Sequence, residues 1–399
     1  MCPQNIFFFQ TVGCMSFAPN PIIPNLLTFQ PNRPFDRTWP LGTPRMTSSF
    51  PPDCPSDPTH VEPQWLTWHL KKAGLLTETT VKSVQCKPIG ASVGFLSRMA
   101  RIVPEYSEPT STGPASMILK METHEPNFRA VANRLRAFDR EVGFYRHVAP
   151  GATTRLPRLY ASDAAGGGGW MLMEDLSHLE NGDQVHGLTN AQVTMALKHM
   201  AVVHAASWNQ QTLADYDWLP DDSFWFREDL SEVWPKFREH YQLRIGSAGT
   251  ALIEQVLERS SLIDAAIAAR PRTLVHGDLR ADNLLLGKPG SEDEVLILDW
   301  QTATRSLGAI DVAMLIGGSE PPPERAGHYQ EIFDSWRATL LANGVVDYQR
   351  DHALRDLRLA LLSCLRIPLK VFAELGGPDF KNAREAQLAD VFILRHTSA

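Results

Sequence analysis

Polar side chains that could do chemistry are concentrated in the segment 274–301, which reads LVHGDLRADNLLLGKPGSEDEVLILDWQ. Asp278 follows a short apolar run, Asn283 comes five residues later, and Asp299 ends a second apolar run. The apolar triplet 284–286 and the polar loop after it predict a hairpin that would fold Asp299 back beside Asn283. Carboxylate and amide oxygens are the ligands that Mg²⁺ prefers, and a further carboxylate can accept the proton of an attacking hydroxyl. The set therefore indicates phosphoryl transfer.

The pattern H-G-D-x-x-x-x-N followed by D-W-Q resembles the catalytic and metal-binding loops of protein-kinase-like enzymes. Gly277 stands where protein kinases regulated through this position carry an arginine. The pattern is therefore most similar to the small-molecule branch, the aminoglycoside phosphotransferase and ecdysteroid kinase-like families. This resemblance implies that Asp278 is the catalytic base and that Asn283 and Asp299 hold Mg²⁺. The alternative interpretation is a chance hairpin with acidic turns.

Other residues of the motif region are expected to support the loop rather than to react. The resemblance implies that His276 orients the catalytic loop. It also places Asp311, near the start of a predicted helix, where its carboxylate would brace the loop backbone. His204, on a helix capped by Thr189 or Asn190, matches a family helix position, and we expect it to serve packing.

Length and composition frame these motifs. At 399 residues, with 43% apolar and 21% charged residues, the chain has the composition of an ordinary globular protein with room for two lobes. A net charge of −7 argues against a nucleic-acid partner, which would require a basic stripe. The sequence has no run of 18 apolar residues, so we expect no membrane span. Five cysteines in neither a disulfide framework nor a zinc spacing favour a reducing, cytoplasmic setting.

The first 60 residues differ from the rest. Residues 1–32 contain no charged side chain, and 13 of the 29 prolines fall within the first 63 residues. Regular structure cannot persist through so many prolines, and the prolines interrupt any apolar stretch that could act as a signal peptide. We interpret residues 1–60 as a disordered extension. Met46 is a plausible alternative start, and a functional tail is the other reading.

From Val61 onward the sequence predicts a small α+β lobe that ends near Glu174. Apolar residues at helical spacing predict a first helix, which Gly74 closes. The expected elements of this lobe are a helix at 62–76, strands within 82–106 and 114–122, a helix at 127–147, a flexible glycine link at 166–169 and a strand at 170–173.

Three features of this lobe look like an ATP clamp. Gly90 and Gly94 could form a hairpin loop whose backbone amides approach phosphate, although their spacing departs from that of protein kinases and also fits a simple turn. The string L-M-E-D-L-S resembles the connector between the lobes of this superfamily. There, backbone groups from Glu174 to Leu176 would bond the adenine edge.

The third feature is Lys120, which ends an apolar strand and could place its ammonium group on the α and β phosphates. A strand-terminal lysine is commonly just solvated, but a kinase-like lobe needs a carboxylate on the following helix to hold this lysine. Glu141 leads the string E-V-G-F-Y, which looks like that helix in the ecdysteroid kinase-like group. Arg140 and Glu122 are the rival residues.

These interpretations combine into an α+β, bilobal protein-kinase-like fold with a sheet-containing N-lobe and a larger, mainly helical C-lobe. The expected organisation is an extension at 1–60, an ATP-clamping N-lobe at 61–174 and a C-lobe at 175–399. The acceptor site should lie in the C-lobe. Segments 215–234 and 320–375 are candidates for it, but their acidic and aromatic residues also fit a solvated face over core tryptophans.

The expected function is transfer of the γ-phosphate of ATP, with Mg²⁺, to a hydroxyl group of a small organic acceptor. An antibiotic-modifying phosphotransferase is the second interpretation, and a non-catalytic nucleotide-binding protein is the third. The intact Asp278, Asn283 and Asp299 weigh against the third. Steroids, sugars, amino alcohols, macrolides and aminoglycosides all offer hydroxyls, and fold resemblance does not choose among them. The sequence also leaves open ATP versus GTP and the oligomeric state.

Overall fold

The computed structural model describes residues 54–89, 96–108, 112–221, 230–319, 328–374 and 383–397, all within the compact unit Pro51–Ala399. Most of the proline-rich extension predicted at residues 1–60 lies outside the described residues. The predicted phosphate loop with Gly90 and Gly94 lies outside them too, as does part of each candidate acceptor segment.

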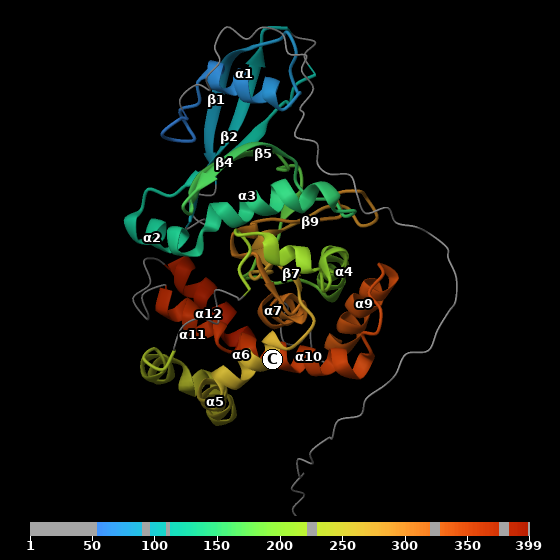
Figure 1. Cartoon of the computed structure of the whole chain (residues 1–399). Coiled ribbons are helices and arrows are strands. Elements are labelled where there is room, and N and C mark those ends of the chain that lie inside the picture. The colour runs from blue at the N-terminus through green and yellow to red at the C-terminus, as the bar shows by residue number, and fades with distance from the viewer. Residues whose placement is uncertain are drawn as a thin grey trace, which may run out of the picture. The chain divides into compact units, whose positions relative to one another are not determined.

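A five-stranded antiparallel sheet forms the N-terminal part, in the strand order β1-β2-β3-β5-β4 (Figure 1). Helix α1 packs on this sheet, because Trp65, Leu66 and Leu70 on one helix face are buried against its apolar side chains. The elements are α1 (Pro63–Lys72), β1 (Val81–Ile89), β2 (Ser97–Tyr106), β3 (Met117–Glu122), β4 (Leu159–Ala165) and β5 (Gly168–Glu174).

Two predictions for this part of the chain were wrong. The expected single helix at 127–147 is two helices, α2 (Pro126–Leu135) and α3 (Ala137–His147). Arg136 between them adopts left-handed angles (φ 53°), and its guanidinium donates to the carbonyl oxygen of Asp217, which holds the break. Of the expected flexible glycine link at 166–169, Gly166 and Gly167 form the tight turn of the β4–β5 hairpin, while Gly168 and Gly169 begin β5 and pair with β4.

The rest of the described chain is mainly helical. Helix α7 lies at its centre and is buried at every position, with α10 and α12 packed on it (Figure 1). The helices are α4 (Asn190–Ser207), α5 (Trp234–Glu258), α6 (Ser260–Ala268), α7 (Ala309–Ser319), α9 (Tyr329–Ala342), α10 (Arg350–Cys364), α11 (Ile367–Glu374) and α12 (Ala383–Thr397). The short strands are β6 (Glu180–Asn181), β7 (Thr273–Val275), β8 (Leu284–Leu286), β9 (Val295–Ile297) and β10 (Thr304–Ser306).

The start of α4 shows how closely local sequence rules hold where a helix has strong signals. Thr189 accepts a hydrogen bond from the backbone of Gln192, and the Gln192 side chain bonds back to the backbone of Thr189. This capping box satisfies two backbone donors that a helix start leaves open.

The α+β, bilobal, kinase-like fold is confirmed: a small antiparallel sheet with its own core leads into a larger helical part with a second core. Among the described residues, no helix combines the length and the apolarity that a bilayer crossing requires.

Candidate active site

The predicted hairpin between Asn283 and Asp299 is present. Strands β8 and β9 pair antiparallel, with Leu284 opposite Ile297, and the N–H of Leu298 donates to the carbonyl oxygen of Asn283 at 2.9 Å. Asp299 follows with left-handed backbone angles (φ 64°), which end the strand and start the 3-10 turn Trp300–Thr302. The hairpin therefore brings Asn283 and Asp299, sixteen residues apart, to the same place.

The loop before this hairpin is held by Asp311 at the start of α7. One carboxylate oxygen accepts the N–H of His276 at 2.7 Å and the other accepts the N–H of Gly277 at 2.9 Å. Gly277 has φ 80°, and a Cβ there would lie 2.6 Å from the carbonyl oxygen of Thr302, so this turn requires glycine. His204 also bonds Asp311 at 3.2 Å, and its other ring nitrogen takes the N–H of Trp336. The predicted supports therefore meet in one buried network.

His276 joins the two halves of the motif. Its Nδ1 accepts the N–H of Asp278 at 3.2 Å, and its Nε2 lies 2.8 Å from the carbonyl oxygen of Leu298, which assigns the proton to Nε2. The ring also packs on Trp300, with ring centroids 4.7 Å apart. With both ring nitrogens engaged inside the protein, His276 orients Asp278 against the strand that leads to Asp299.

Asp278 lies beside a cation and an amide. Its Oδ2 accepts from Arg280 Nε and from Asn283 Nδ2, each at 3.2 Å, while no described residue donates to Oδ1. Burial raises the pKa of the Asp278 carboxyl above its usual value, although the guanidinium of Arg280 opposes this rise. A carboxylate with a raised pKa is a stronger proton acceptor, which suits a general base.

Lys120 lies between two carboxylates. Its ammonium group is 3.0 and 2.7 Å from the two carboxylate oxygens of Glu141 and 2.9 Å from Asp299 Oδ1. The rival residues make other contacts, since Glu122 pairs with Arg129 and Arg140 donates to the carbonyl oxygen of Ala303. Strand β3, helix α3 and the Asp299 turn therefore converge at one ammonium.

When all three side chains are ionised, Lys120, Glu141 and Asp299 carry one positive and two negative charges. Burial disfavours the charged lysine, but the carboxylates of Asp299 and Glu141 outweigh it and raise the pKa of Lys120. Burial likewise opposes ionisation of Asp299, yet Lys120 prevails and lowers the pKa of Asp299. The effect of burial prevails at Glu141, where it raises the pKa of the carboxyl to about 7.

The donor set fits Mg²⁺. Within the described ranges, no three His, Cys, Asp or Glu side chains form a preassembled metal site. Mg²⁺ characteristically takes only one or two protein oxygens and completes its shell with phosphate oxygens and water. Asp299 keeps Oδ2 outside its bond to Lys120, and the amide nitrogen of Asn283 is turned toward Asp278, which leaves the amide oxygen for a cation.

The connector between the sheet and the helical part forms hydrogen bonds with the loop between α3 and β4. The N–H of Glu174 donates to the carbonyl oxygen of Arg158 at 2.9 Å, and the Glu174 carboxylate accepts from Arg155 Nη2 at 2.7 Å. The carbonyl oxygen of Leu176 accepts from Leu179, whereas no described residue takes the N–H of Leu176. Of the predicted adenine contacts, the amide of Leu176 is therefore one open backbone group within the described chain.

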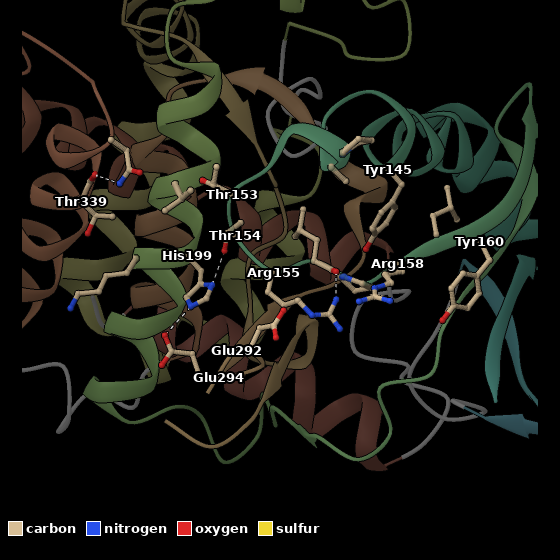
Figure 2. Close-up of a pocket in the computed structure, with 18 of the residues that line it drawn as sticks. Tyr145, Thr153, Thr154, Arg155, Arg158, Tyr160, His199, Glu292, Glu294 and Thr339 are labelled. Atoms are coloured by element: carbon tan, nitrogen blue, oxygen red, sulfur yellow. Dashed lines mark hydrogen bonds and ion pairs between the residues drawn. The ribbon is translucent and has the colours of Figure 1, made fainter. Parts of the chain in front are cut away.

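A cavity of about 1170 Å³ lies beside this connector, between the α3–β4 loop, α4 and the β8–β9 loop (Figure 2). We call it the side cavity. Arg155 on its wall joins Glu174 to Asp293, and His199 bonds Thr154 at 2.8 Å and Glu294 at 3.0 Å. None of the predicted catalytic or metal-binding residues lines it.

Sequence reasoning missed Arg280 and Gln184. Arg280 stands two residues after Asp278 and two before Asp282, and a cationic side chain between two acidic ones was the available signal. Gln184 contacts the catalytic loop from a distant loop and has no local signal at all.

The sequence profile of the ecdysteroid kinase-like family matches residues 93–343. None of the curated proteins compared with the chain matches it. Similar solved structures are a choline kinase from Cryptosporidium parvum (13% identity, 79% of this chain and 87% of that chain, TM-score 0.47), a macrolide 2'-phosphotransferase from Brachybacterium faecium (15%, 82% and 97%, 0.44) and an ethanolamine kinase from Plasmodium vivax (13%, 82% and 87%, 0.47). Because these TM-scores are below 0.5, the similarities by themselves assign no substrate.

Proposed function

Because the chain belongs to the ecdysteroid kinase-like family of small-molecule kinases, we propose that it transfers the γ-phosphate of ATP, with Mg²⁺, to a hydroxyl group of a small organic acceptor. The observation that carries this proposal is the convergence of Asp278, Asn283, Asp299, Lys120 and Glu141, with one ammonium among the carboxylates and an open carboxylate oxygen on Asp278.

In the proposed reaction the acceptor oxygen attacks the γ-phosphorus, the bond from that phosphorus to the β-phosphate oxygen breaks, and ADP leaves. Asp278 accepts the hydroxyl proton as the new P–O bond forms. The side-chain amide of Asn283 donates a hydrogen bond to the Asp278 carboxylate, and the guanidinium of Arg280 donates to the same oxygen. The chain thus positions a base rather than forming a covalent intermediate.

Asn283 and Asp299 would hold Mg²⁺, which when bound neutralises the charge of the transferring phosphates. Lys120 would contact the α and β phosphates, with Glu141 keeping it in place, and the open N–H of Leu176 would donate to the adenine edge. Such positioning and charge neutralisation supply most of the acceleration in phosphoryl transfer.

The acceptor and the location of the enzyme stay predictions. A cytoplasmic setting rests on the cysteine pattern, and Cys54, Cys86 and Cys364 are all free thiols in the described chain. The family name points toward a hydroxylated, bulky apolar acceptor before an amino sugar. Hydroxylated steroids are therefore the first compounds to test, ahead of amino alcohols, sugars and antibiotics.

The test is Mg²⁺-dependent ADP release by the wild type and by Asp278→Asn in the presence of pooled hydroxylated steroids, amino alcohols, sugars and antibiotics. The wild type should release ADP with one pool, and the variant should lose roughly 10²–10⁴-fold in turnover, the usual contribution of a general base. Near-normal turnover in the variant would remove the base assignment. ATP binding without release in any pool would favour the non-catalytic reading.

A further inference from the structure

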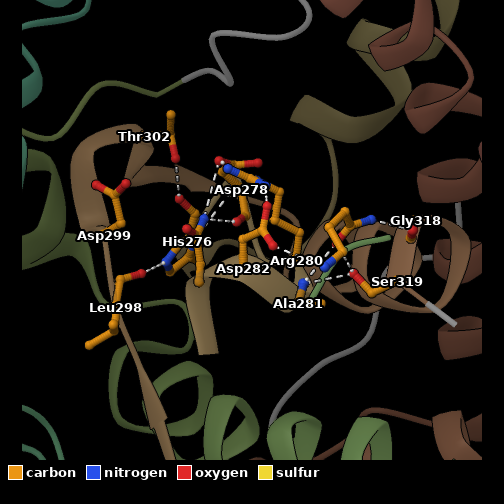
Figure 3. Close-up of polar contacts among 12 residues, drawn as sticks. His276, Asp278, Arg280, Ala281, Asp282, Leu298, Asp299, Thr302, Gly318 and Ser319 are labelled. Atoms are coloured by element: carbon orange, nitrogen blue, oxygen red, sulfur yellow. Dashed lines mark hydrogen bonds and ion pairs between the residues drawn. The ribbon is translucent and has the colours of Figure 1, made fainter. Parts of the chain in front are cut away.

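A buried glutamine outside the motif holds the backbone of the catalytic loop. The Oε1 of Gln184, in the loop between β6 and α4, accepts the N–H of Ala281 at 3.0 Å and the hydroxyl of Ser319 at 2.9 Å. Its Nε2 donates to the carbonyl oxygen of Gly318 at the end of α7. Gln184 is 1% exposed, so these bonds form away from water. The three residues that it bonds, Ala281, Gly318 and Ser319, lie together in Figure 3.

The same residue reaches the catalytic base through two charged side chains. The backbone N–H of Gln184 donates to Asp282 Oδ1 at 2.9 Å, and Asp282 Oδ2 accepts from Arg280 Nη1 at 2.5 Å. Arg280 in turn donates to the carboxylate of Asp278 at 3.2 Å. The loop lies tightly on Ala281, because a Cβ on Gly182 would overlap the Ala281 carbonyl oxygen. The position of Arg280 against Asp278 therefore depends on where Gln184 lies.

Gln184 is itself held by the last helix of the described chain. Arg395, near the end of α12, donates from Nη1 to the carbonyl oxygen of Gln184 at 2.6 Å and from Nη2 to that of Val185 at 2.9 Å. The guanidinium is nearly buried, with 8% of the residue exposed. Its planar fork matches two successive carbonyl groups, which a lysine cannot reproduce.

We propose that Arg395 and Gln184 are positioning residues of the phosphotransfer reaction, which set the catalytic loop through Ala281 and Asp282 and so fix Arg280 against Asp278. Docking of the C-terminal helix α12 then completes the active site, although α12 contributes none of the predicted catalytic, metal-binding or nucleotide-binding residues. The role of Asp278 in this inference rests on the proposed function, whereas the order of the loop does not.

The test uses the full-length chain with Arg395→Met and Arg395→Lys. Displacement of a catalytic group by about 1 Å lowers turnover by up to about 10²-fold, so Arg395→Met should lose roughly 10- to 100-fold in kcat. Its KM for ATP should change less than kcat, because Lys120 and Leu176 lie outside this chain of contacts and only Asn283 of the proposed nucleotide and metal contacts lies within the loosened segment. Arg395→Lys should recover part of kcat. Hydrogen–deuterium exchange without ligands should rise in the peptide spanning 278–284.

The matched control is Arg244→Met. Arg244 also ties α12 to the rest of the protein, through a 2.9 Å ion pair with Asp390, but no described contact leads from it to the catalytic loop. It should change neither kcat nor exchange in the loop. Unchanged exchange in 278–284 together with unchanged kcat in Arg395→Met would refute the proposal. So would an equal rise in exchange over the whole chain, since that indicates general destabilisation.

The two proposals fail differently. If the wild type transfers no phosphate to any pooled acceptor while Arg395→Met selectively loosens residues 278–284, the proposed function is wrong and the coupling of α12 to the loop is supported. If the wild type is active and Asp278→Asn is not, but Arg395→Met behaves as the wild type, only the positioning role is lost.

Discussion

The active-site cluster and the side cavity each hold one cation between two carboxylates, but they differ in how deeply one of those carboxylates is buried. In the cluster, Lys120 is the one ammonium shared by Glu141 and Asp299. In the cavity wall, Arg155 meets Glu174 and Asp293, whose side chains are 20% and 32% exposed, so water also solvates both carboxylates. In the cluster, the Glu141 side chain is buried beside its ammonium, and burial raises the pKa of its carboxyl.

This difference teaches which property identifies a site. The side cavity is large and rich in polar groups, and some of these bond one another, as His199 does with Thr154 and Glu294. The pKa directions agree with this, because the hydrogen bond from His199 lowers the pKa of Glu294 while burial raises the pKa of Asp278. A buried carboxyl with a raised pKa is therefore a better indicator of chemistry than cavity volume.

The largest contrast should come from removing one cation from each region. Lys120→Met takes away the ammonium that would meet the phosphates, and we expect turnover to fall by about 10²–10³-fold, as for other lost electrostatic contacts of a transition state. Lys198→Met, on the cavity wall, removes an exposed lysine and should leave turnover unchanged. Steady-state ADP release measures both. Equal losses in the two variants would erase the distinction between the regions.

The second contrast is the pH dependence of turnover. As the proposed base, Asp278 would have to be ionised to accept a proton, and burial raises its pKa, with Arg280 and His276 opposing the rise and Asp299 adding to it. Turnover should therefore fall as the pH drops through this raised pKa, by about tenfold per pH unit well below it. A kcat profile against pH checks this limb. An acidic limb that persists unchanged in the residual activity of Asp278→Asn would assign it to another group.

The smallest effect on catalysis should come from Arg155→Met. This change leaves Glu174 and Asp293 without their shared cation, and we expect a loss of roughly 1–2 kcal/mol in the free energy of unfolding, because both carboxylates are partly solvated. Turnover should stay near normal. Arg158→Met, whose exposed guanidinium lines the same cavity, is the matched control and should leave the thermal midpoint unchanged. A large loss of turnover in Arg155→Met would make the cavity part of the active site.

The fold and the motif residues could be predicted because their signals are local. The spacing of Asp278, Asn283 and Asp299 encodes a hairpin, and a hairpin needs only neighbouring residues to form. The capping box at Thr189 is likewise readable within four residues. Lys120 and Glu141 were found by their order along the chain, and their 2.7 Å contact is what the structure adds.

The rest could not be read from local patterns. Arg395 and Gln184 are separated by 211 residues, and neither an arginine near a chain end nor a glutamine in a loop is unusual by itself. The break at Arg136 was missed because helical periodicity continues through it. It depends instead on the carbonyl oxygen of Asp217, which lies 81 residues away in sequence.

The stack between Phe144 and Trp300 joins helix α3 to the turn that follows Asp299. The two rings lie 3.6 Å apart and 9° from parallel, and Phe144 belongs to the core of the helical part rather than to the core under the sheet. Separating them would expose two buried aromatic faces to water. Helix α3 is therefore packed on the Asp299 turn. The bonds from Lys120 to Glu141 and to Asp299 join strand β3 to this same unit, so a single ammonium ties the sheet to both of its parts.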